Sequence, residues 1–521
     1  MGEEVERRVF SHADRRNYRM KLRRCLEALR LLQDKNLFDM ERTLTGVELE
    51  LSLISETGEP AMRNLEVLSN LAKLDGVEDM SVQAELGRFN LEMNLPPRPI
   101  KDNGLGEYEE MLRRWLAALD DCARQANAAP LLIGITPTFT HDAALLDNLS
   151  PLPRYRLLND QILAARGEDI ALDIHGAESL QTYTDSIAPE SANTSVQIHI
   201  QVTPEQFPRY WNAAQAIAGV QVALGANSPY LFGSQLWAET RIIVFEQATD
   251  VRCDELRTQG VRPRTFFGER WVASAIELFE ENLRYFMPLL PVCDHEDPVA
   301  AVARGDIPHL GELRLHNGTI YRWNRPVYDV TDAGPHLRVE NRVLPTGPTL
   351  IDICANMAFY LGLVTALAEQ EVPVWTKLPF AVAENNFIAA AKHGIDALQV
   401  WPGLGEVPAR VLARDHLLPL ARQGLRRLQV DERLATRLLS IIEGRCATGV
   451  NGAVWQVATV NALQEERGMS RPEALRAMLL GYRARAETNT PVHDWPPLLI
   501  QDARHEVLFE VEAVSEPVVD R

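Results

Sequence analysis

The chain has 521 residues, of which 46% are hydrophobic and 24% charged, a composition typical of a folded globular protein rather than a disordered or collagen-like one. Its 53 Lys and Arg stand against 72 Asp and Glu, and the resulting net charge of -19 opposes binding to nucleic acid or to anionic membranes. The length exceeds that of an ordinary domain, so we expect one large unit with appended helices, or two domains.

Cysteine usage and the N-terminus indicate where the protein resides. The six cysteines are spread along the chain without a CxxC pair or a zinc-finger spacing, which favours a reducing compartment. The first residues lack the cationic start and apolar run of a signal peptide, and we find no uncharged apolar stretch of about 18 residues. We therefore expect a cytoplasmic protein with no membrane and no nucleic acid among its partners.

The chain divides into three parts by its periodicity. Residues 3–34 show helical spacing with many arginines, which predicts an amphipathic surface helix within an N-terminal segment, 1–40. Residues 41–350 mix alternating stretches with helical ones at 108–126, 208–224 and 270–287, as in an α+β domain. Residues 351–521 carry helical stretches in series without a long linker, so we expect an all-helical C-terminal region docked on that domain.

Three segments of the middle part alternate apolar and polar residues, so each predicts a strand with one polar face. Two carboxylates on one face repel each other, and such a face is favourable only if water, Arg or a metal ion screens them. The polar residues are Glu48 and Glu50 in the first segment, Glu92 in the second with Glu85 seven residues before it, and His199 and Gln201 in the third.

Two later segments, 311–319 and 336–349, show the same alternation and are also predicted to be strands. None of the polar residues named on these five faces is Lys, although Lys is common on exposed strands. A solvated sheet face remains the alternative. The polar residues are Glu312, Arg314 and His316 in the first of these segments and Arg338, Glu340 and Arg342 in the second.

These faces together predict a curved antiparallel sheet whose concave polar side holds Mg²⁺ or Mn²⁺ between carboxylates and nucleotide phosphates. The sequence contains no GxxxxGK[ST] loop and no GxGxxG fingerprint, so phosphate binding at a helix N-terminus has no support. Recognition of ATP through metal and Arg is the natural substitute.

At these residues the chain resembles the glutamate–cysteine ligase family, in particular its carboxylate–amine ligase branch within the glutamine synthetase-like superfamily. The resemblance implies the fold of that superfamily, in which a curved, mainly antiparallel sheet flanked by helices forms a concave active site. It spans about residues 44–365 and rests on GVELEL (46–51), ELGRFNLEMN (85–94), QIHIQV (197–202), GANSPYLFG (225–233), ETRIIVFEQ (239–247) and LRVENRVLPTGPT (337–349).

The resemblance also implies roles for individual residues. Arg342 matches the arginine that contacts the transferred phosphoryl group, Arg241 looks like the arginine that binds the substrate carboxylate, and Gln201 and Arg338 are expected beside the nucleotide. Gln197 stands where relatives often have a second His, so the substrate can differ from theirs. The implied metal ligands are Glu48, Glu50, Glu85, Glu92, His199 and Glu340.

The reaction that the resemblance implies is the ATP-dependent joining of a small carboxylate, an amino acid such as glutamate, to an amine. An acyl phosphate would be the intermediate, and the amide product could be a γ-glutamyl one. Two alternatives stay open: a phosphotransferase of the same superfold, and a non-catalytic regulator that binds ATP or metal. A homo-oligomer is compatible with all three.

Overall fold

The computed structural model describes residues 10–39 and 43–496. Its centre is a curled sheet of seven strands in the order β12-β13-β7-β1-β3-β2, with β4 also paired to β1. Every neighbouring pair is antiparallel, which confirms the predicted curved antiparallel sheet. The strands are β1 (Thr45–Ile54), β2 (Val82–Ala84), β3 (Asn90–Arg98), β4 (Ala129–Leu131), β7 (Ser195–Val202), β12 (Asn324–Thr331) and β13 (Gly334–Pro345).

The pairing register gives this sheet one continuous polar face. In β1 the side chains of Val47 and Leu49 are buried in the core, while Glu48 and Glu50 point to the other side. Glu50 lies directly opposite Glu92 of β3, and residues opposite each other in an antiparallel pair share a face. In the same way His199 of β7 lies opposite residue 340 of β13, so the acids and the histidine come together across four strands.

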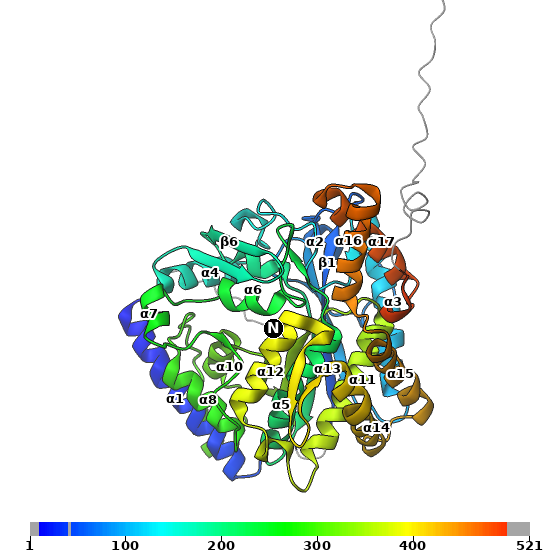
Figure 1. Ribbon diagram of the computed structural model, residues 1–521. Helices are drawn as coiled ribbons and strands as arrows, with labels where there is room; N and C mark the ends of the chain where they lie inside the picture. Colours follow the sequence, from blue (N-terminus) through cyan, green and yellow to red (C-terminus); the bar gives the residue numbers. More distant parts are fainter. Residues whose placement is uncertain (1–9, 40–42, 497–521) are drawn as a thin grey trace, which may run out of the picture.

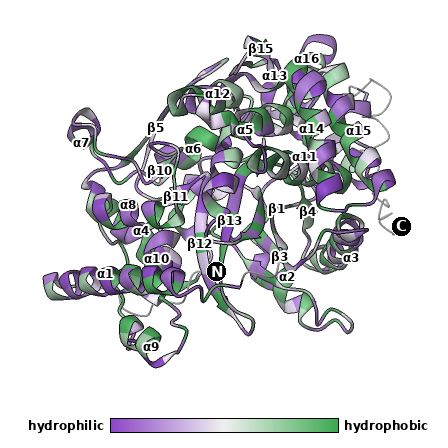
Figure 2. Ribbon diagram, turned by 90° about the horizontal axis from the view of Figure 1, so that it is seen from below, coloured by the Kyte–Doolittle hydropathy of each residue, from purple (hydrophilic) through white to green (hydrophobic). Residues whose placement is uncertain are grey.

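Helices cover both faces of the sheet (Figures 1 and 2). Against the apolar face pack α3 (Gly104–Gln125), α5 (Phe207–Gly225) and α11 (Leu350–Ala368), and their side chains join those of the strands in one core cluster. Over the polar face lie α4 (Pro153–Arg166), α8 (Ala275–Tyr285) and α10 (Gly311–Gly318). The polar face is therefore a covered surface rather than an outer one.

The N-terminal helix α1 (His12–Asp34) confirms the helix predicted there, although residues 3–9 lie outside the described part of the chain. It begins at a capping box in which the Ser11 side chain accepts from the backbone N–H of Asp14 and the Asp14 carboxylate accepts in return. Its apolar stripe packs against α8, α9 (Pro298–Arg304) and α10, so α1 supports the helices that cover the polar face.

After α11 the chain is mainly helical, and α11 itself is the core of this region. It is long and apolar enough to cross a membrane, but it is entirely buried among other described residues. It crosses α14 (Leu418–Arg427) closely at two glycines, because a Cβ added at Gly424 would lie 1.7 Å from the carbonyl oxygen of Gly362. The other helices are α12 (Phe380–His393), α13 (Ala409–Leu412), α14 (Leu418–Arg427), α15 (Glu432–Thr448), α16 (Gly452–Arg467) and α17 (Arg471–Glu487).

Short elements complete the fold. The α2 helix (Asn64–Leu71) follows β1, and two further helices, α6 (Arg241–Ala248) and α7 (Asp254–Thr258), lie in the middle of the chain. The remaining strands form two-stranded pairs: β5 (Ile170–His175) with β6 (Ser179–Thr184), β8 (Tyr230–Leu231) with β9 (Ser234–Gln235), β10 (Thr265–Phe266) with β11 (Tyr321–Arg322), and β14 (Leu398–Trp401) with β15 (Gly405–Pro408).

Two sequence predictions about secondary structure are wrong. The expectation that the C-terminal region is all helical fails at the β14–β15 hairpin, where a Gly-rich turn joins two strands of four residues each. The strand predicted over 311–319 is the helix α10, so Glu312, Arg314 and His316 do not share one face. A short alternation of apolar and polar residues does not distinguish a strand from one side of a short helix.

Candidate active site

A cavity of about 300 Å³ lies between the polar face of the sheet and the helices that cover it. Its wall opposite the sheet comes from α4, α8 and α10 and includes Arg154, Tyr155, Phe279 and Arg314. The solvated-face alternative is thereby excluded. The polar and charged residues that line the cavity from the sheet side are Glu48, Glu50, Gln83, Glu85, Glu92, Gln197, His199, Arg325, Asp329, Arg338, Glu340 and Arg342.

Glu340 and Arg342 form the centre of the cationic part of this cavity. They are two residues apart on β13, and the Arg342 Nη1 donates to Glu340 Oε1 at 2.6 Å and to the side-chain oxygen of Gln197. Arg325 of the neighbouring β12 donates to Glu340 Oε2 at 2.9 Å. Burial disfavours a charged Glu340, but the two arginines lower the pKa of this carboxyl below its usual value.

Glu50 is held from three sides. Its Oε2 accepts from the backbone N–H of Ser195 at 2.6 Å and from the Ser195 hydroxyl at 3.0 Å, and its Oε1 accepts from Gln197 at 2.8 Å. Burial raises the pKa of Glu50 in spite of these bonds. Gln197, the residue that stands in place of a second histidine, therefore links Glu50 to Arg342 by donating through its nitrogen and accepting through its oxygen.

Glu85 and Glu92 crowd negative charge at the other end. Burial, and next the charge of Glu92, raise the pKa of Glu85 well above its usual value, and burial with Glu48 and Glu50 raises the pKa of Glu92 to about 7. Tyr155 donates to Glu85 at 3.0 Å. Carboxylates whose pKa values are raised by burial and by neighbouring acids favour a cation between them.

Glu48 and His199 form the third part of the site. His199 Nε2 lies 3.1 Å from Glu48 Oε1, and neither ring nitrogen of this buried histidine has a well-aligned hydrogen-bond acceptor or donor. Burial opposes a charged Glu48, but the charge of His199 prevails and lowers the pKa of Glu48 to about 2. A buried imidazole without aligned partners next to a carboxylate is chemically suited to metal ligation.

The six predicted metal ligands thus line one cavity, and their oxygen and imidazole donors fit a hard divalent cation. In the described part of the chain, however, no three such side chains are close enough together to form a metal site as they stand. Glu50 and Glu340 are held by neighbouring donors. Since each carboxylate oxygen has two lone pairs, these bonds leave room for a cation as well.

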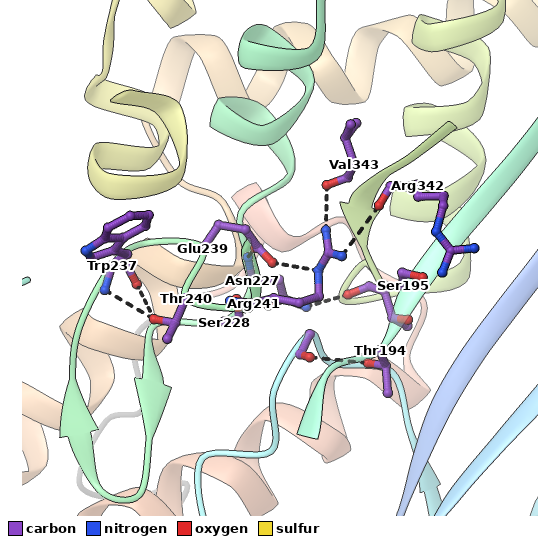
Figure 3. Close-up of polar contacts among 12 residues, drawn as sticks. Thr194, Ser195, Asn227, Ser228, Trp237, Glu239, Thr240, Arg241, Arg342 and Val343 are labelled. Atoms are coloured by element: carbon purple, nitrogen blue, oxygen red, sulfur yellow. Dashed lines mark hydrogen bonds and ion pairs between the residues drawn. The ribbon is translucent and has the colours of Figure 1, made fainter. Parts of the chain in front are cut away.

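Three other predicted residues lie in different surroundings. Arg338 lines the cavity and pairs with Asp329 at 3.5 Å. Gln201 is outside the cavity lining, and its side-chain nitrogen donates to Asp39 at 3.1 Å. Arg241 is also outside the lining, at the N-terminus of α6, where its guanidinium contacts Glu239 and backbone carbonyls of β13 (Figure 3). The roles assigned to these residues stay predictions.

Several cavity residues were missed by the sequence predictions. Arg325 and Asp329 belong to β12 and share one strand face with Val327, and the period-2 spacing of the two charged residues could have revealed this face. Arg154 and Tyr155 come from the start of the helix α4, and no local pattern marks a helical residue as facing a distant sheet.

Known proteins resemble this chain in fold. A bifunctional glutathione synthetase from Pasteurella multocida is 12% identical with a TM-score of 0.50, and the match covers 89% of this chain and 55% of that one. A glutamate–cysteine ligase from Francisella tularensis in complex with AMP is 11% identical with a TM-score of 0.49, covering 90% of this chain and 98% of that one. No curated protein matches the sequence.

The sequence itself matches a family over most of its length. The sequence model of glutamate–cysteine ligase family 2 matches residues 44–478. This range is longer than residues 44–365, over which the motifs resemble the family, and it includes most of the C-terminal helices. The chain therefore belongs to glutamate–cysteine ligase family 2 and is an ATP-dependent ligase that forms carbon–nitrogen bonds.

Proposed function

We propose that the enzyme transfers the γ-phosphoryl group of ATP to the carboxylate of a small acid, and that an amine then attacks the acyl phosphate. The carboxylate oxygen bonds to phosphorus as ADP leaves. The amine nitrogen then bonds to the acyl carbon as phosphate leaves, and the amine loses one proton. The observation that carries this proposal is the position of Arg342 and the carboxylates on one polar face of a single cavity.

Arg342 is the residue suited to the transferring phosphoryl group. Its guanidinium lines the cavity, is fixed by Glu340 and Gln197, and stays charged because the neighbouring carboxylates raise its pKa against the effect of burial. A fixed cation aimed at developing negative charge stabilises the transition state without reorganisation. Arg338 on the same strand, with Gln201, is assigned to the nucleotide, and both assignments rest on the family resemblance.

Mg²⁺ or Mn²⁺ would be held by Glu48, Glu50, Glu85, Glu92, His199 and Glu340, and when bound it supplies positive charge that neutralises the phosphates. The donor set supports this, since it offers carboxylate oxygens and one imidazole in a cavity whose acids repel one another. The chain's own residues orient these donors: Ser195 and Gln197 hold Glu50, and Tyr155 holds Glu85.

The substrates fit a small acid and a small amine, with an amino acid such as glutamate as the acid and a γ-glutamyl amide as one product. The cavity of about 300 Å³ lies at the lower end of the usual range for small-molecule sites. The net charge of -19 argues against nucleic acid and membrane partners, and we assign the enzyme to the cytoplasm on its cysteine usage. A homo-oligomer remains compatible with the fold.

The test is incubation with Mg-ATP, hydroxylamine and a panel of single amino acids. Hydroxylamine traps an acyl phosphate as a hydroxamate whatever the natural amine is. We expect ADP release and hydroxamate formation with at least one acid, detected by mass spectrometry. Release of ADP without hydroxamate would support a phosphotransferase, and absence of ADP release with every acid would contradict the proposal.

A further inference from the structure

The strand that carries Arg342 is irregular at that residue. Along β13, Asn341 is opposite Ile198 of β7 and Leu344 is opposite Val196, so three steps on β13 match two steps on β7. Arg342 and Val343 thus occupy a β-bulge and have no register partners on β7. A bulge of this kind redirects a side chain and leaves backbone groups unpaired.

A second arginine binds the carbonyl groups of this bulge. Arg241 donates through Nη2 to the carbonyl oxygen of Val343 at 2.6 Å and through Nη1 to that of Arg342 at 3.5 Å (Figure 3). Its side chain is 3% exposed, and the Arg342 side chain extends away from it toward the cavity. Buried carbonyls need donors, and the planar guanidinium fork supplies two in a fixed geometry.

Arg241 is itself held by a fully buried carboxylate. Glu239 Oε1 accepts from Arg241 Nε at 3.0 Å, and Glu239 Oε2 accepts from the backbone N–H of Asn227 at 2.8 Å. The Asn227 side chain in turn donates to the carbonyl of Thr346, the residue that follows β13, at 2.8 Å. Arg241 therefore holds the backbone at the bulge, Asn227 holds it at residue 346, and Glu239 binds both of these residues.

The C-terminal helices complete this network. Gln456 of α16 donates to Asn227 Oδ1 at 2.9 Å, and the Asn227 side chain donates to the hydroxyl of Tyr482 of α17 at 2.8 Å. Helices more than a hundred residues downstream of β13 thus support the backbone that presents Arg342.

We propose that Arg241 is a positioning residue for Arg342, acting through the bulge carbonyls of β13, and that it does not bind the substrate carboxylate. This inference deepens the proposed function and rests on it for its kinetic test. It reassigns the substrate role expected for Arg241 because all three guanidinium nitrogens of that residue have protein partners and the residue is not part of the cavity lining.

The kinetic test is Arg241→Lys, assayed as hydroxamate formation with the acid that the panel identifies. Lysine keeps the charge but cannot span two carbonyls and Glu239, so Arg342 should move. We expect kcat to fall by about 10- to 100-fold while the KM for the acid changes by less than about twofold. A KM for the acid that rises by tenfold or more at unchanged kcat would overturn the inference, since it indicates direct substrate binding.

A double-mutant cycle separates positioning from general loosening. In an Arg342→Ala background, Arg241→Lys should cost less than about twofold in kcat, because the residue it positions is gone. If Arg241→Lys lowers kcat by the same factor in the Arg342→Ala background as in the wild type, the inference is overturned. The matched control is Arg445→Lys, which changes another buried arginine bonded to a carboxylate, Asp352, and to a backbone carbonyl outside the cavity. Arg445→Lys should lower the Tm without a comparable loss of kcat. A loss of kcat equal to that of Arg241→Lys would contradict the inference.

Two further experiments keep the inference testable if Arg241→Lys does not fold or the wild-type enzyme is inactive with every acid. Glu239→Gln replaces one accepting oxygen by an amide N–H₂, which faces the donor of Arg241 or the backbone N–H of Asn227. This variant should lower kcat at nearly unchanged KM, as Arg241→Lys does, but by a smaller factor. A crystal structure of either variant should show the Arg342 guanidinium shifted from Glu340 and Gln197. An unshifted Arg342 overturns the inference independently of activity, whereas inactivity of the wild type with the whole panel contradicts only the proposed function.

Discussion

Single side chains in the cavity are arranged so that opposite charges are separated into two ends. Arg325 and Arg342 donate hydrogen bonds to Glu340 at one end. Glu85 and Glu92 lie at the other end, where the hydrogen bonds of the described residues come from the neutral side chains of Tyr155, Gln83 and Asn94. Burial, together with the charges of Glu48 and Glu50, raises the pKa of Glu92 to about 7. A phosphoryl group suits the first end and a metal ion the second.

Arg342→Ala tests the cationic end. Removing a guanidinium that contacts the phosphoryl group should lower kcat by about 100- to 1000-fold, because one such transition-state contact contributes about 3 to 4 kcal/mol. The measurement is the rate of ADP release at saturating acid, with far-ultraviolet circular dichroism as the check on folding. A kcat within about threefold of the wild-type value would refute the role of Arg342.

Glu92→Gln tests the acidic end. The amide keeps the size of the side chain but removes a charged metal ligand, so the Mg²⁺ concentration for half-maximal activity should rise about 10- to 100-fold. Glu246→Gln is a matched control, since Glu246 is also a carboxyl whose pKa burial raises to about 8 but it does not line the cavity. An unchanged Mg²⁺ requirement in Glu92→Gln would remove Glu92 from the proposed ligands.

At the scale of elements, the helix α10 shows why one strand prediction failed. Within this helix Glu312 accepts from the backbone of Asp294, Arg314 pairs with Asp329 at 3.1 Å, and His316 bonds to the carbonyl of Asn282. On a strand these three side chains would share a face, whereas the helix sends them to three different neighbours. These three contacts join residues that are 15 to 34 positions apart in the sequence, and a local alternation does not contain them.

The buried His316 of α10 makes the stability of the protein depend on pH. Burial lowers the pKa of His316 from 6.5 to about 4, so the unfolded state binds its proton first and stability falls as pH drops from about 6.5 toward 4. By this linkage His316 should account for about 2 kcal/mol of the stability lost between pH 7 and pH 5. Urea unfolding of wild type and His316→Gln at both pH values is the measurement, and equal losses in the two proteins would contradict the assignment.

For the whole molecule, the C-terminal region belongs to the same core as the sheet. One continuous hydrophobic cluster extends from Tyr18 of α1 through the strands to Cys446 of α15, and Arg445 pairs with Asp352 at 2.7 Å in a fully buried contact. The boundary predicted at residue 350 therefore separates parts that share a core. Family membership over residues 44–478 agrees with that continuity.

Truncation tests this continuity. A chain ending at residue 350 loses α11, whose side chains are all buried, and also loses the partners of Asn227 on α16 and α17. We expect it to show no cooperative thermal transition, because the exposed core surface removes far more than the usual 5 to 15 kcal/mol of net stability. A fragment 1–350 that unfolds cooperatively and binds Mg-ATP would show instead that the C-terminal helices are a separate, dispensable layer.

The sequence predicts much of this architecture because alternation is a local property. Glu48, Glu50, Glu92, His199, Glu340 and Arg342 were placed on polar strand faces by period alone, and the structure brings them into one cavity with Glu85. The contacts that the sequence could not supply are long-range ones, such as Tyr155 with Glu85 or Arg241 with the β13 bulge. Neither a bulge nor the approach of a helix to a sheet leaves a periodic signal in one sequence.

The most direct test of the central claim follows an oxygen atom from the acid. The acid identified by the panel, prepared with ¹⁸O in its reacting carboxylate, is converted with Mg-ATP and the amine, and the phosphate and nucleotide products are analysed by mass spectrometry. An acyl phosphate requires that one ¹⁸O atom pass from the acid into inorganic phosphate, with ADP as the nucleotide product. Unlabelled phosphate, or ¹⁸O recovered in AMP, would contradict the account.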